Sequence, residues 1–448
     1  MTSRGFKAAR WALGGALGAT LFAGCEAHLD VLGPAAAGRH DGGSGGSAEM
    51  DSTASEHDAS AGRRDASFVM RDARPPPDVS PPLPDVAPPI DVTEPPNHAV
   101  TELRASYSDT CAIAGGTLYC WGSLPDGSKV SVPQRVPGSA AGAFRHVSGG
   151  ATAHCATRAS GLVYCFGSND RGELGQGDRT ARGTPTLVSL PGASEVVAGK
   201  FDAFCSRIAD GRLECWGQND EGQMGEGDSG MPKDALTPVR VESASDWLGV
   251  AAGQGHVCGI RAPGALYCWG RNTDGELGQG AVSYVQVRTP TRVQDASDWT
   301  TVVAGQNHTC GLRAPGRLFC FGSGADGQLG MSPRANTNVP TQVGDGTDWR
   351  SFDTDTFHGC GIRGSGTLWC WGRNAEGQLG TGDVADRDTP TQIGSESSWA
   401  DVSVGRFHTC ARRTDGSAWC TGANDGGQLG TADNDRRNVF TEVVWGPG

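Results

Sequence analysis

The cysteines are the residues whose type and spacing point most directly to chemistry. Of the 15 cysteines, all but Cys25 fall into pairs that recur about every fifty residues, with eight or nine residues between the two members of a pair. Paired cysteines can form a disulfide across a hairpin, or they can ligate zinc as thiolates. The seven pairs are Cys111 and Cys120, Cys155 and Cys165, Cys205 and Cys215, Cys258 and Cys268, Cys310 and Cys320, Cys360 and Cys370, and Cys410 and Cys420.

The spacing favours disulfides over zinc. Structural zinc sites bring four ligands together and usually leave two to four residues between paired ligands. The pairs in this chain are wider, and they lie on separate repeats. We therefore expect one disulfide within each repeat, with zinc as the alternative, and we expect neither a cofactor nor a metal.

The residues between the paired cysteines predict β-hairpins. In the last six pairs the middle three residues end in glycine, as in residues 262–264 (Ala-Pro-Gly) and 414–416 (Thr-Asp-Gly). This pattern predicts a three-residue loop whose glycine adopts the left-handed conformation. The first pair is centred on Gly115 and Gly116, which predicts a two-residue turn. Both turns place the cysteines opposite each other on adjacent strands, where a disulfide can form.

A second motif, Gly-x-Leu-Gly or Gly-x-Met-Gly, follows each of the last six pairs. Its glycines allow positive φ and close backbone approach, and its Leu or Met is expected to fill the core, so we interpret it as a structural turn. The first copy lacks this motif and has Ser-Leu-Pro-Asp-Gly at residues 123–127. The predicted turn residues are Gly172, Leu174, Gly175, Gly222, Met224, Gly225, Gly275, Leu277, Gly278, Gly327, Leu329, Gly330, Gly377, Leu379, Gly380, Gly427, Leu429 and Gly430.

The turns must connect strands that are covered on both faces. Residues 266–269 (Leu-Tyr-Cys-Trp) are apolar on both faces, as expected for a strand between two neighbouring repeats. In one copy we expect strands at 301–304, 308–313, 318–322 and 340–343, with the proline of the fourth strand at its beginning. Two aromatic series are expected to pack between repeats: Trp121, Phe166, Trp216, Trp269, Phe321 and Trp371, and then Trp247, Trp299, Trp349 and Trp399.

Together these features resemble the regulator of chromosome condensation repeat. The resemblance is carried by residues 304–310 (Ala-Gly-Gln-Asn-His-Thr-Cys), 318–322 (Leu-Phe-Cys-Phe-Gly) and 327–330 (Gly-Gln-Leu-Gly), and it recurs seven times over about residues 100–446. It implies an all-β, seven-bladed β-propeller with four-stranded antiparallel blades, a number that the seven cysteine pairs match. The first copy departs from the pattern, so the closing blade is expected to be irregular.

The segment before the repeats predicts export. Three basic residues in the first ten precede an apolar stretch at 11–23, which has the layout of a secretory signal peptide and is too short to span a bilayer. The stretch ends at Cys25 and resembles a bacterial lipoprotein signal, so Cys25 is expected to be lipidated. A plain signal peptide with an incidental cysteine is the alternative. We predict a signal peptide at 1–24, a disordered Gly/Ser/Asp/Pro-rich tether at 25–97 and the propeller at 98–448.

Net charge limits the classes of binding partner, and cysteine content indicates the cellular compartment. The net charge is −13, and removal of the three bases of residues 1–24 leaves −16. Nucleic acid is therefore not expected as a partner, because binding phosphates requires an excess of Lys and Arg. The number of cysteines fits an oxidising compartment. We expect an outer-membrane or cell-surface lipoprotein that contacts the membrane only through Cys25.

Three other patterns could form sites, and each has a structural explanation. His256, His308, His358 and His408 recur two residues before a cysteine, but around a seven-fold axis they would lie too far apart for one zinc ion, so we expect hydrogen-bonded structural histidines. Residues 227–230 (Gly-Asp-Ser-Gly) imitate a serine-protease loop in the register of an ordinary repeat loop. The acidic residues at 353–355 and 433–435 lack the ordered ligand loop of a calcium site.

We therefore expect a non-enzymatic, exported binding scaffold that presents its loops to a protein or glycan. The loops after the turn motif, such as 279–288 and 331–338, vary most among the copies, as in a recognition surface on a rigid scaffold. One alternative is an envelope hydrolase or lyase with an axial active site, which would need two acidic residues close together in an axial pocket. A purely structural envelope protein is the other alternative.

Overall fold

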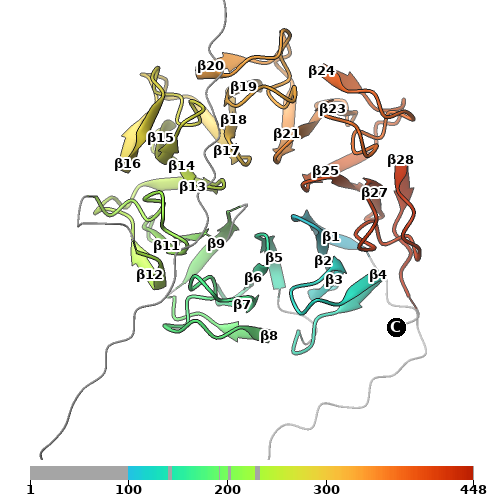
Figure 1. Ribbon diagram of the computed structural model, residues 1–448, viewed down its shortest axis with the longest axis horizontal. Helices are drawn as coiled ribbons and strands as arrows, with labels where there is room; N and C mark the ends of the chain where they lie inside the picture. Colours follow the sequence, from blue (N-terminus) through green and yellow to red (C-terminus); the bar gives the residue numbers. More distant parts are fainter. Residues whose placement is uncertain (1–98, 140–143, 191, 200–202, 228–232, 447–448) are drawn as a thin grey trace, which may run out of the picture. The chain divides into compact units, whose positions relative to one another are not determined.

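The computed structural model describes residues 99–139, 144–190, 192–199, 203–227 and 233–446, without the side chains of 194–198. The expected signal peptide, Cys25 and the expected tether lie outside these residues. The described part forms seven four-stranded antiparallel sheets, each built from four consecutive strands. Figure 1 shows the sheets as blades around a ring, with the first blade beside the seventh. The predicted all-β, seven-bladed propeller is confirmed. In the described ranges, no helix is long and apolar enough to cross a membrane.

The strands of each blade run outward from the ring axis in sequence order (Figure 1). The innermost strands are β1 (Val100–Ala105), β5 (Phe144–Gly149), β9 (Ala193–Ala198), β13 (Trp247–Ala252), β17 (Trp299–Ala304), β21 (Trp349–Thr354) and β25 (Trp399–Val404). The second strands are β2 (Asp109–Ala114), β6 (Ala153–Arg158), β10 (Ala203–Ile208), β14 (His256–Arg261), β18 (His308–Arg313), β22 (His358–Arg363) and β26 (His408–Arg413).

The third and fourth strands complete each blade. The third strands are β3 (Thr117–Ser123), β7 (Val163–Gly167), β11 (Leu213–Gly217), β15 (Ala265–Asn272), β19 (Arg317–Gly322), β23 (Leu368–Gly372) and β27 (Ala418–Gly422). The outermost strands are β4 (Lys129–Arg135), β8 (Arg182–Leu187), β12 (Ala235–Arg240), β16 (Ser283–Arg292), β20 (Thr337–Gln342), β24 (Arg387–Gln392) and β28 (Arg437–Glu442).

The expected strand positions are right to within one residue for the second and third strands, but the innermost strand begins at Trp299 rather than at 301, and the outermost strand is also misplaced. In the blade of β17 to β20, the outermost strand begins at Thr337 rather than at 340 and ends at Gln342. Pro340 therefore lies inside the strand and not at its beginning. An outermost strand tolerates an internal proline because no further strand needs the missing N–H as a donor.

Each hairpin between the second and third strands holds one disulfide. The paired cysteines are direct cross-strand partners, as in Cys258 opposite Cys268, and their Cα atoms lie 4.0 to 4.1 Å apart in all seven bonds. The expected left-handed glycine occurs at Gly416, with φ 87°. At Gly264 and Gly316 φ is also positive but larger, 142° and 146°.

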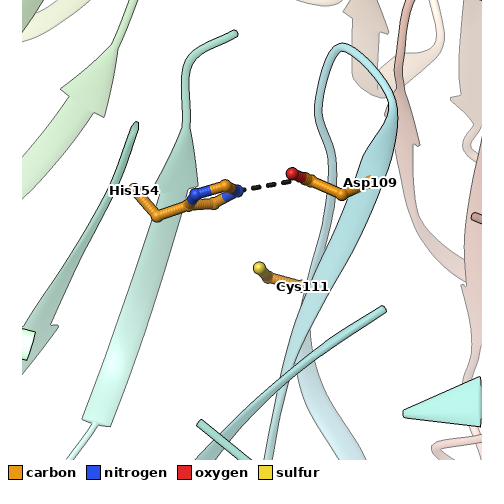
Figure 2. Close-up of side chains that lie close together, drawn as sticks. All are labelled: Asp109, Cys111 and His154. Carbon is orange, nitrogen blue, oxygen red and sulfur yellow. Dashed lines mark hydrogen bonds and ion pairs between the residues drawn. The ribbon is translucent and has the colours of Figure 1, made fainter. Parts of the chain in front are cut away.

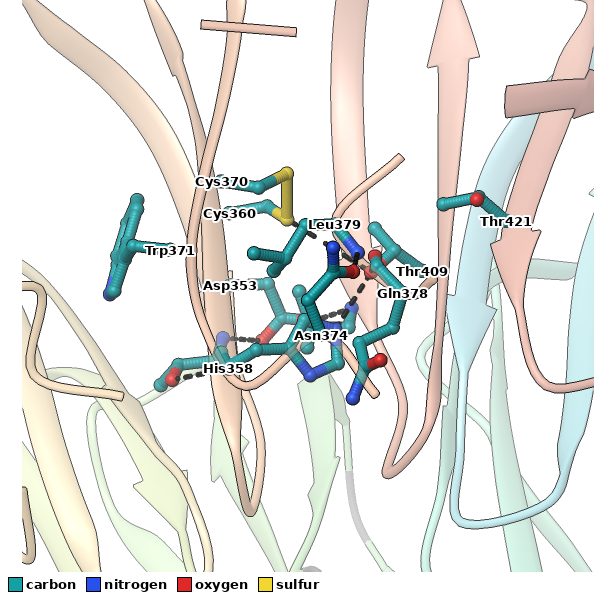
Figure 3. The surroundings of a disulfide bond; sticks show 12 residues. Asp353, His358, Cys360, Cys370, Trp371, Asn374, Gln378, Leu379, Thr409 and Thr421 are labelled. Atoms are coloured by element: carbon teal, nitrogen blue, oxygen red, sulfur yellow. Dashed lines mark hydrogen bonds between the residues drawn. A yellow bond between two sulfur atoms is a disulfide. The ribbon is translucent and has the colours of Figure 1, made fainter. Parts of the chain in front are cut away.

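The turn motif joins each of the last six blades to the next blade around the ring. In the second blade, Leu174 packs between the Cys155–Cys165 disulfide and Trp216 of the third blade. The Trp216 indole N–H donates to the carbonyl oxygen of Glu173 at 2.8 Å. Figure 3 shows the turn of the sixth blade, where Leu379 lies beside the Cys360–Cys370 disulfide. Equivalent indole bonds join Trp269 to Gln223, Trp371 to Gln328 and Trp121 to Gln428.

Buried histidines form a second set of bonds between blades. The Nε2 atom of each histidine lies within hydrogen-bond distance of a threonine hydroxyl on the next blade: His256 to Thr309 at 2.9 Å, His308 to Thr354 at 2.6 Å, His358 to Thr409 at 2.8 Å and His408 to Thr110 at 2.9 Å. Burial and the positive charge of Arg271 lower the pKa of His256 to about 3. Burial lowers the pKa of His408 to about 4, although Asp109 opposes this shift.

Removal of one disulfide should destabilise the ring by a definite amount. In a variant that combines Cys360→Ala and Cys370→Ala, we expect the free energy of unfolding to fall by about 2.5 to 3 kcal/mol, because a loop of about ten residues is no longer closed in the unfolded chain. Guanidinium unfolding measures this change, with Cys25→Ser as a control that should leave the value unchanged. An unchanged free energy of unfolding, or peptide maps that link cysteines of different blades, would contradict this expectation.

Acid should destabilise the fold through the buried histidines. The folded pKa values of His256 and His408 lie below the unfolded value of about 6.5, so the unfolded state binds more protons and the free energy of unfolding falls as pH decreases from about 6.5 towards 3 to 4. Each histidine can add at most about 1.4 kcal/mol per pH unit. His256→Gln should reduce this slope in denaturant titrations at several pH values. Thr309→Val should lower the free energy of unfolding but keep its slope with pH. Equal slopes in the unchanged protein and in both variants would contradict this prediction.

Candidate functional site

The turn residues interpreted as structural lie between the blades. The Leu or Met of each turn is at most 2% exposed. Sequence analysis assigned no role to an asparagine that precedes the turn by three residues. Its side-chain oxygen accepts the backbone N–H of the turn residue, as from Leu174 to Asn169 at 3.0 Å and from Leu379 to Asn374 at 2.9 Å. Its recurrence at a fixed distance was the signal that could have revealed this role.

The acidic residues considered for calcium have donors within the chain. Asp353 Oδ2 accepts the Ser403 hydroxyl at 3.1 Å and the Val404 N–H at 2.7 Å. Asp433 forms an ion pair with Arg437. These carboxylates therefore hold the scaffold together. Of the serine-protease-like segment, residues 228–230 lie outside the described part of the chain.

One cluster has the composition of a metal site but not its chemistry. Potential ligand atoms of Asp109, Cys111 and His154 lie within 4.8 Å of one another, and all three residues are buried (Figure 2). Cys111, however, is bonded to Cys120, and a disulfide sulfur offers no thiolate to a metal. The remaining pair, His154 Nε2 and Asp109 Oδ1, lies at hydrogen-bond distance, 3.0 Å. At the junction between the first and second blades, this pair replaces the histidine and threonine that bond to each other at other junctions.

The ring axis contains a cavity of about 290 Å³ with charged walls. It is lined from the innermost strands, and its charged residues are Glu102, Arg104, Asp353, Asp401 and, when protonated, His146. Arg104 forms ion pairs with Glu102 at 2.9 Å and with Asp401 at 3.3 Å. The structure thus brings together the acidic residues that an axial hydrolase would need. Two of them are bridged by one guanidinium group, so they form an ion network.

Burial and neighbouring charges set the protonation of this network. Burial raises the pKa of Asp401, and Glu102 adds to this effect, whereas Arg104 opposes it. Burial by itself lowers the pKa of Arg104, but the three surrounding carboxylates outweigh it and raise that pKa overall. Arg104 therefore stays charged and holds the innermost strands of the first and seventh blades together.

A second arginine lies on the face that carries the turn motifs. We call Tyr107, Phe357, Arg373, Arg406 and Phe407 the arginine surface; most of them come from loops that join the first and second strands of the first, sixth and seventh blades. The guanidinium carbon of Arg406 lies 4.4 Å from the Tyr107 ring centroid and 4.9 Å from that of Phe407. Phe407 stacks on Phe357 with centroids 5.3 Å apart. All five residues are partly exposed.

Arg406 differs from most arginines of this protein. Within the described ranges, no carboxylate forms an ion pair with it, and burial lowers its pKa. Aromatic rings partly replace water around the cation, since ring faces attract guanidinium groups. The sequence did not reveal this surface because Tyr107 is far along the chain from the other members, although its blade lies beside the seventh blade in the ring (Figure 1). The recurring aromatic residue directly before a histidine, at Phe357 and Phe407, was the available signal.

An exposed apolar segment extends from the same face of the fourth blade. β16 is the longest strand described, with ten residues, and its first half belongs to the loop 279–288 that sequence analysis selected as variable. Tyr284 is 90% exposed and Val285 75% exposed, and Val282 just before the strand is 57% exposed. Exposed aromatic and apolar side chains grouped in one segment are typical of interaction sites.

Known proteins with related sequences come from several eukaryotes. The chain is 29% identical over 236 residues to the ultraviolet-B receptor UVR8 of Arabidopsis thaliana, an alignment that covers 50% of this chain and 52% of the relative. It is 28% identical over 181 residues to the human regulator of chromosome condensation, covering 40% and 42%. The chain thus spans about half, or less, of the length of these relatives.

Solved structures share the fold. Yeast RCC1 (Prp20), in a crystal structure with Kap60, superimposes with a TM-score of 0.62 at 19% identity, covering 78% of this chain and 85% of that one. Human WBSCR16 gives a TM-score of 0.62 at 19% identity, covering 70% and 87%. At this identity the likeness shows the fold alone.

Family profiles match the repeats directly. The profile of the regulator of chromosome condensation (RCC1) repeat matches residues 160–201, 210–260, 263–312, 315–351 and 365–412, and a second profile of the same repeat matches 248–276, 299–328 and 399–428. These matches cover more than half of the chain and begin after the irregular first blade. The chain belongs to the regulator of chromosome condensation repeat family.

Proposed function

We propose that this chain is an exported, lipid-anchored and non-enzymatic scaffold that binds a protein through the face that carries the turn motifs. The arginine surface is the observation that carries the proposal. Arginine and large aromatic residues are enriched among the residues that contribute most to binding in protein interfaces. Among these residues, Arg406 would gain the most binding energy from a partner. A carboxylate of that partner would pair with its positive charge, which the aromatic rings stabilise only in part.

Related proteins support a binding role. The yeast family member was crystallised with a protein, Kap60, and the binding of Prp20p to Gsp1p and histones is the subject of another structure. Those partners belong to those proteins. For this chain the common element is a rigid ring that presents loops to another protein, and the exposed segment at Val282–Val285 adds a second apolar contact on the same face.

Seven disulfides support export. Disulfides persist in oxidising compartments and are rare in the cytosol of most organisms. All fourteen paired cysteines are at most 2% exposed, so each bond lies inside a blade. Together with the lipoprotein-like sequence that ends at Cys25, they support a location in the cell envelope, with the lipid as the membrane anchor.

The axial ion network disfavours an enzymatic role for the axial cavity. Hydrolysis by two carboxyl groups needs one of them as a proton donor and the other as a nucleophile or base, both accessible to substrate. Arg104 bridges Glu102 and Asp401, and Asp353 accepts two hydrogen bonds from the seventh blade. The carboxylates of this cavity are therefore engaged in binding the blades to one another.

The arginine surface predicts a loss of binding on substitution. We expect Arg406→Ala to weaken retention of the partner by about thirtyfold or more, the usual effect of a residue that dominates an interface. The immobilised full-length chain is incubated with cell-envelope extract, and the bound protein is quantified. Asp401→Asn on the axis is the matched control and should retain the partner normally.

Three outcomes would overturn this proposal. Retention that is equal in Arg406→Ala and the unchanged chain would exclude the arginine surface. Retention that survives complete proteolysis of the extract would indicate a glycan. Loss of retention in Asp401→Asn alone would move the site to the axis. Thermal unfolding of both variants checks that the ring is intact.

Lipidation predicts a second, independent result. Cys25→Ser should release the protein from the membrane fraction, because a transferred lipid requires the cysteine sulfur. Fractionation of cells and mass spectrometry of the mature N-terminus measure this. An unmodified Cys25 would argue for a plain signal peptide, and a Cys25→Ser protein that stays in the membrane fraction would contradict the lipid as the anchor.

A further inference from the structure

The junction between the first and second blades lacks the contact that fills the other junctions. In each of the last six blades, the Leu or Met of the turn motif enters the space beside that blade's own disulfide. The glycine after it lies against the next blade. At Gly175, for example, an added Cβ would lie 3.1 Å from Val188 of its own blade and 3.2 Å from Trp216 of the next. The first blade has no such turn.

The residues that would surround the missing turn are nevertheless present. Val136 corresponds to Val188, because each donates its N–H to the third strand of its own blade, Val136 to Leu118 and Val188 to Val163. Phe166 corresponds to Trp216, since each directly follows the second cysteine. Both are buried, and both line a cavity of about 330 Å³. We call this cavity the junction pocket; its walls include Cys120, Leu124, Val136, His154, Phe166 and Gly183.

The junction pocket also lacks the backbone bond that accompanies a filled junction. At five filled junctions, an N–H shortly after the turn donates to a carbonyl of the next outermost strand. The acceptor directly follows the residue that pairs with the glycine of the third strand, as from Gly177 to Leu236 at 2.8 Å and from Ala432 to Ser131 at 2.9 Å. By register, Gly183 on β8 is the equivalent of Leu236. Between the described residues, no such bond reaches Gly183 from the first blade, and Gly183 is exposed at the pocket.

The first blade cannot fill the pocket itself. Only residues 124–128 connect β3 and β4, and this loop closes on itself through bonds from Leu124 N–H to Ser128 and from Gly127 N–H to Leu124. Asp126 accepts the Ser128 hydroxyl within the same loop. Leu124 therefore lies against the pocket wall. In the second blade, by contrast, residues 168–181 connect β7 and β8 and reach across to the third blade.

We propose that the junction pocket binds a loop of a partner protein that carries an acidic residue, then Leu or Met, then Gly. This inference rests on the proposed function and assigns it a specific subsite. The repeats themselves define the ligand, because the same walls accept Leu or Met followed by glycine in the other six junctions. The volume is at the lower end of the range of ligand pockets, which suits one side chain and the adjoining backbone.

Charge favours an acidic residue before the leucine. The pocket lining includes Arg135, Arg182 and one carboxylate, that of Asp126. Arg182 is already paired with Asp178 at 2.7 Å, so Arg135 is the available positive charge. Arg135 is exposed, and in the described part of the chain no carboxylate pairs with it. Two of the chain's own turns have this order, Gly-Glu-Leu-Gly at residues 172–175 and 275–278. In these two turns the glutamate carboxylate accepts a backbone N–H of its own loop, from Arg171 at 2.8 Å and from Asp274 at 2.7 Å. A glutamate of the ligand would stabilise its turn in the same way and bring a negative charge towards Arg135, while the leucine enters the apolar part.

A synthetic peptide tests the proposal on the full-length chain. The peptide copies residues 169–177 of the second blade, and a control peptide has serine in place of the leucine. We expect binding of the first peptide, measured by calorimetry or by chemical shifts, with a dissociation constant about tenfold or more below that of the control, because burial of a leucine side chain accounts for that difference. No binding of either peptide, or equal binding of both, would overturn the proposal.

Two variants locate the binding site. Phe166→Trp restores the indole N–H that elsewhere bonds the carbonyl before the leucine, so the peptide should bind about threefold to tenfold more tightly. Trp216→Phe makes the reverse change at a filled junction and should leave peptide affinity unchanged. Replacement of residues 124–128 by the sequence of residues 168–181 should fill the pocket from within, abolish peptide binding and raise the melting temperature. Peptide binding that is unaffected by both Phe166→Trp and this replacement would overturn the proposal.

The peptide experiment on the junction pocket and the Arg406→Ala experiment on the proposed function can fail independently of each other. If the peptide fails to bind while Arg406→Ala still loses the partner, the junction pocket is not a subsite and the arginine surface stands. If the peptide binds as expected while Arg406→Ala retains the partner, the pocket stands and the arginine surface does not. Peptide binding that requires Leu32→Ser would show that the chain's own Leu32–Gly33 segment occupies the pocket, which would overturn a partner protein as the occupant.

Discussion

The carbonyl group that each turn presents to the next blade is the contact on which the ring depends. In the turns of the second, third, fifth and seventh blades, it accepts the indole N–H of a tryptophan across the junction. At other turns a threonine hydroxyl donates instead, as from Thr309 to Glu276. A buried carbonyl without a donor would be costly, so neighbouring blades must match in chemistry as well as in shape. The disulfide stiffens one blade, whereas these bonds, the turn Leu or Met and the histidine–threonine bonds join neighbouring blades.

The junction between the first and second blades, where the turn carbonyl is missing, also follows this requirement for matching donors and acceptors. The first blade has no turn carbonyl to offer, and the second blade has Phe166, which has no donor. Phe321 of the fifth blade also lacks a donor, but there Thr309 donates to the turn carbonyl of the fourth blade instead. Asp109 and His154 replace the usual histidine and threonine and bond to each other. These substitutions are consistent as a set, so the irregular blade is a coherent variant of the others. It is also where the structure leaves an apolar space open.

Charge is distributed so that different parts of the ring have different roles. On the axis, Arg104 is surrounded by carboxylates that keep it charged and tie the first blade to the seventh. On the face with the turns, Arg406 has aromatic neighbours and no carboxylate among the described residues. Arg104 therefore helps to close the ring, whereas Arg406 is available to a partner. The scaffold and the proposed interface thus use the same residue type in opposite electrostatic settings.

The sequence by itself determined the repeat, the four strands of a blade, the cysteine pairing within each hairpin and the irregularity of the first copy. These features depend on spacing along the chain, because hairpins and turns bring together residues that are close in sequence. It misplaced the start of the outermost strand, since pairing with the third strand, rather than proline, sets that start. Only the tertiary structure decided the arginine surface, the axial ion network and the junction pocket. Tyr107 and Arg406 become neighbours only when the ring closes, and Val136 and Phe166 only when the first two blades pack. The spacing within one repeat carries no information about either contact.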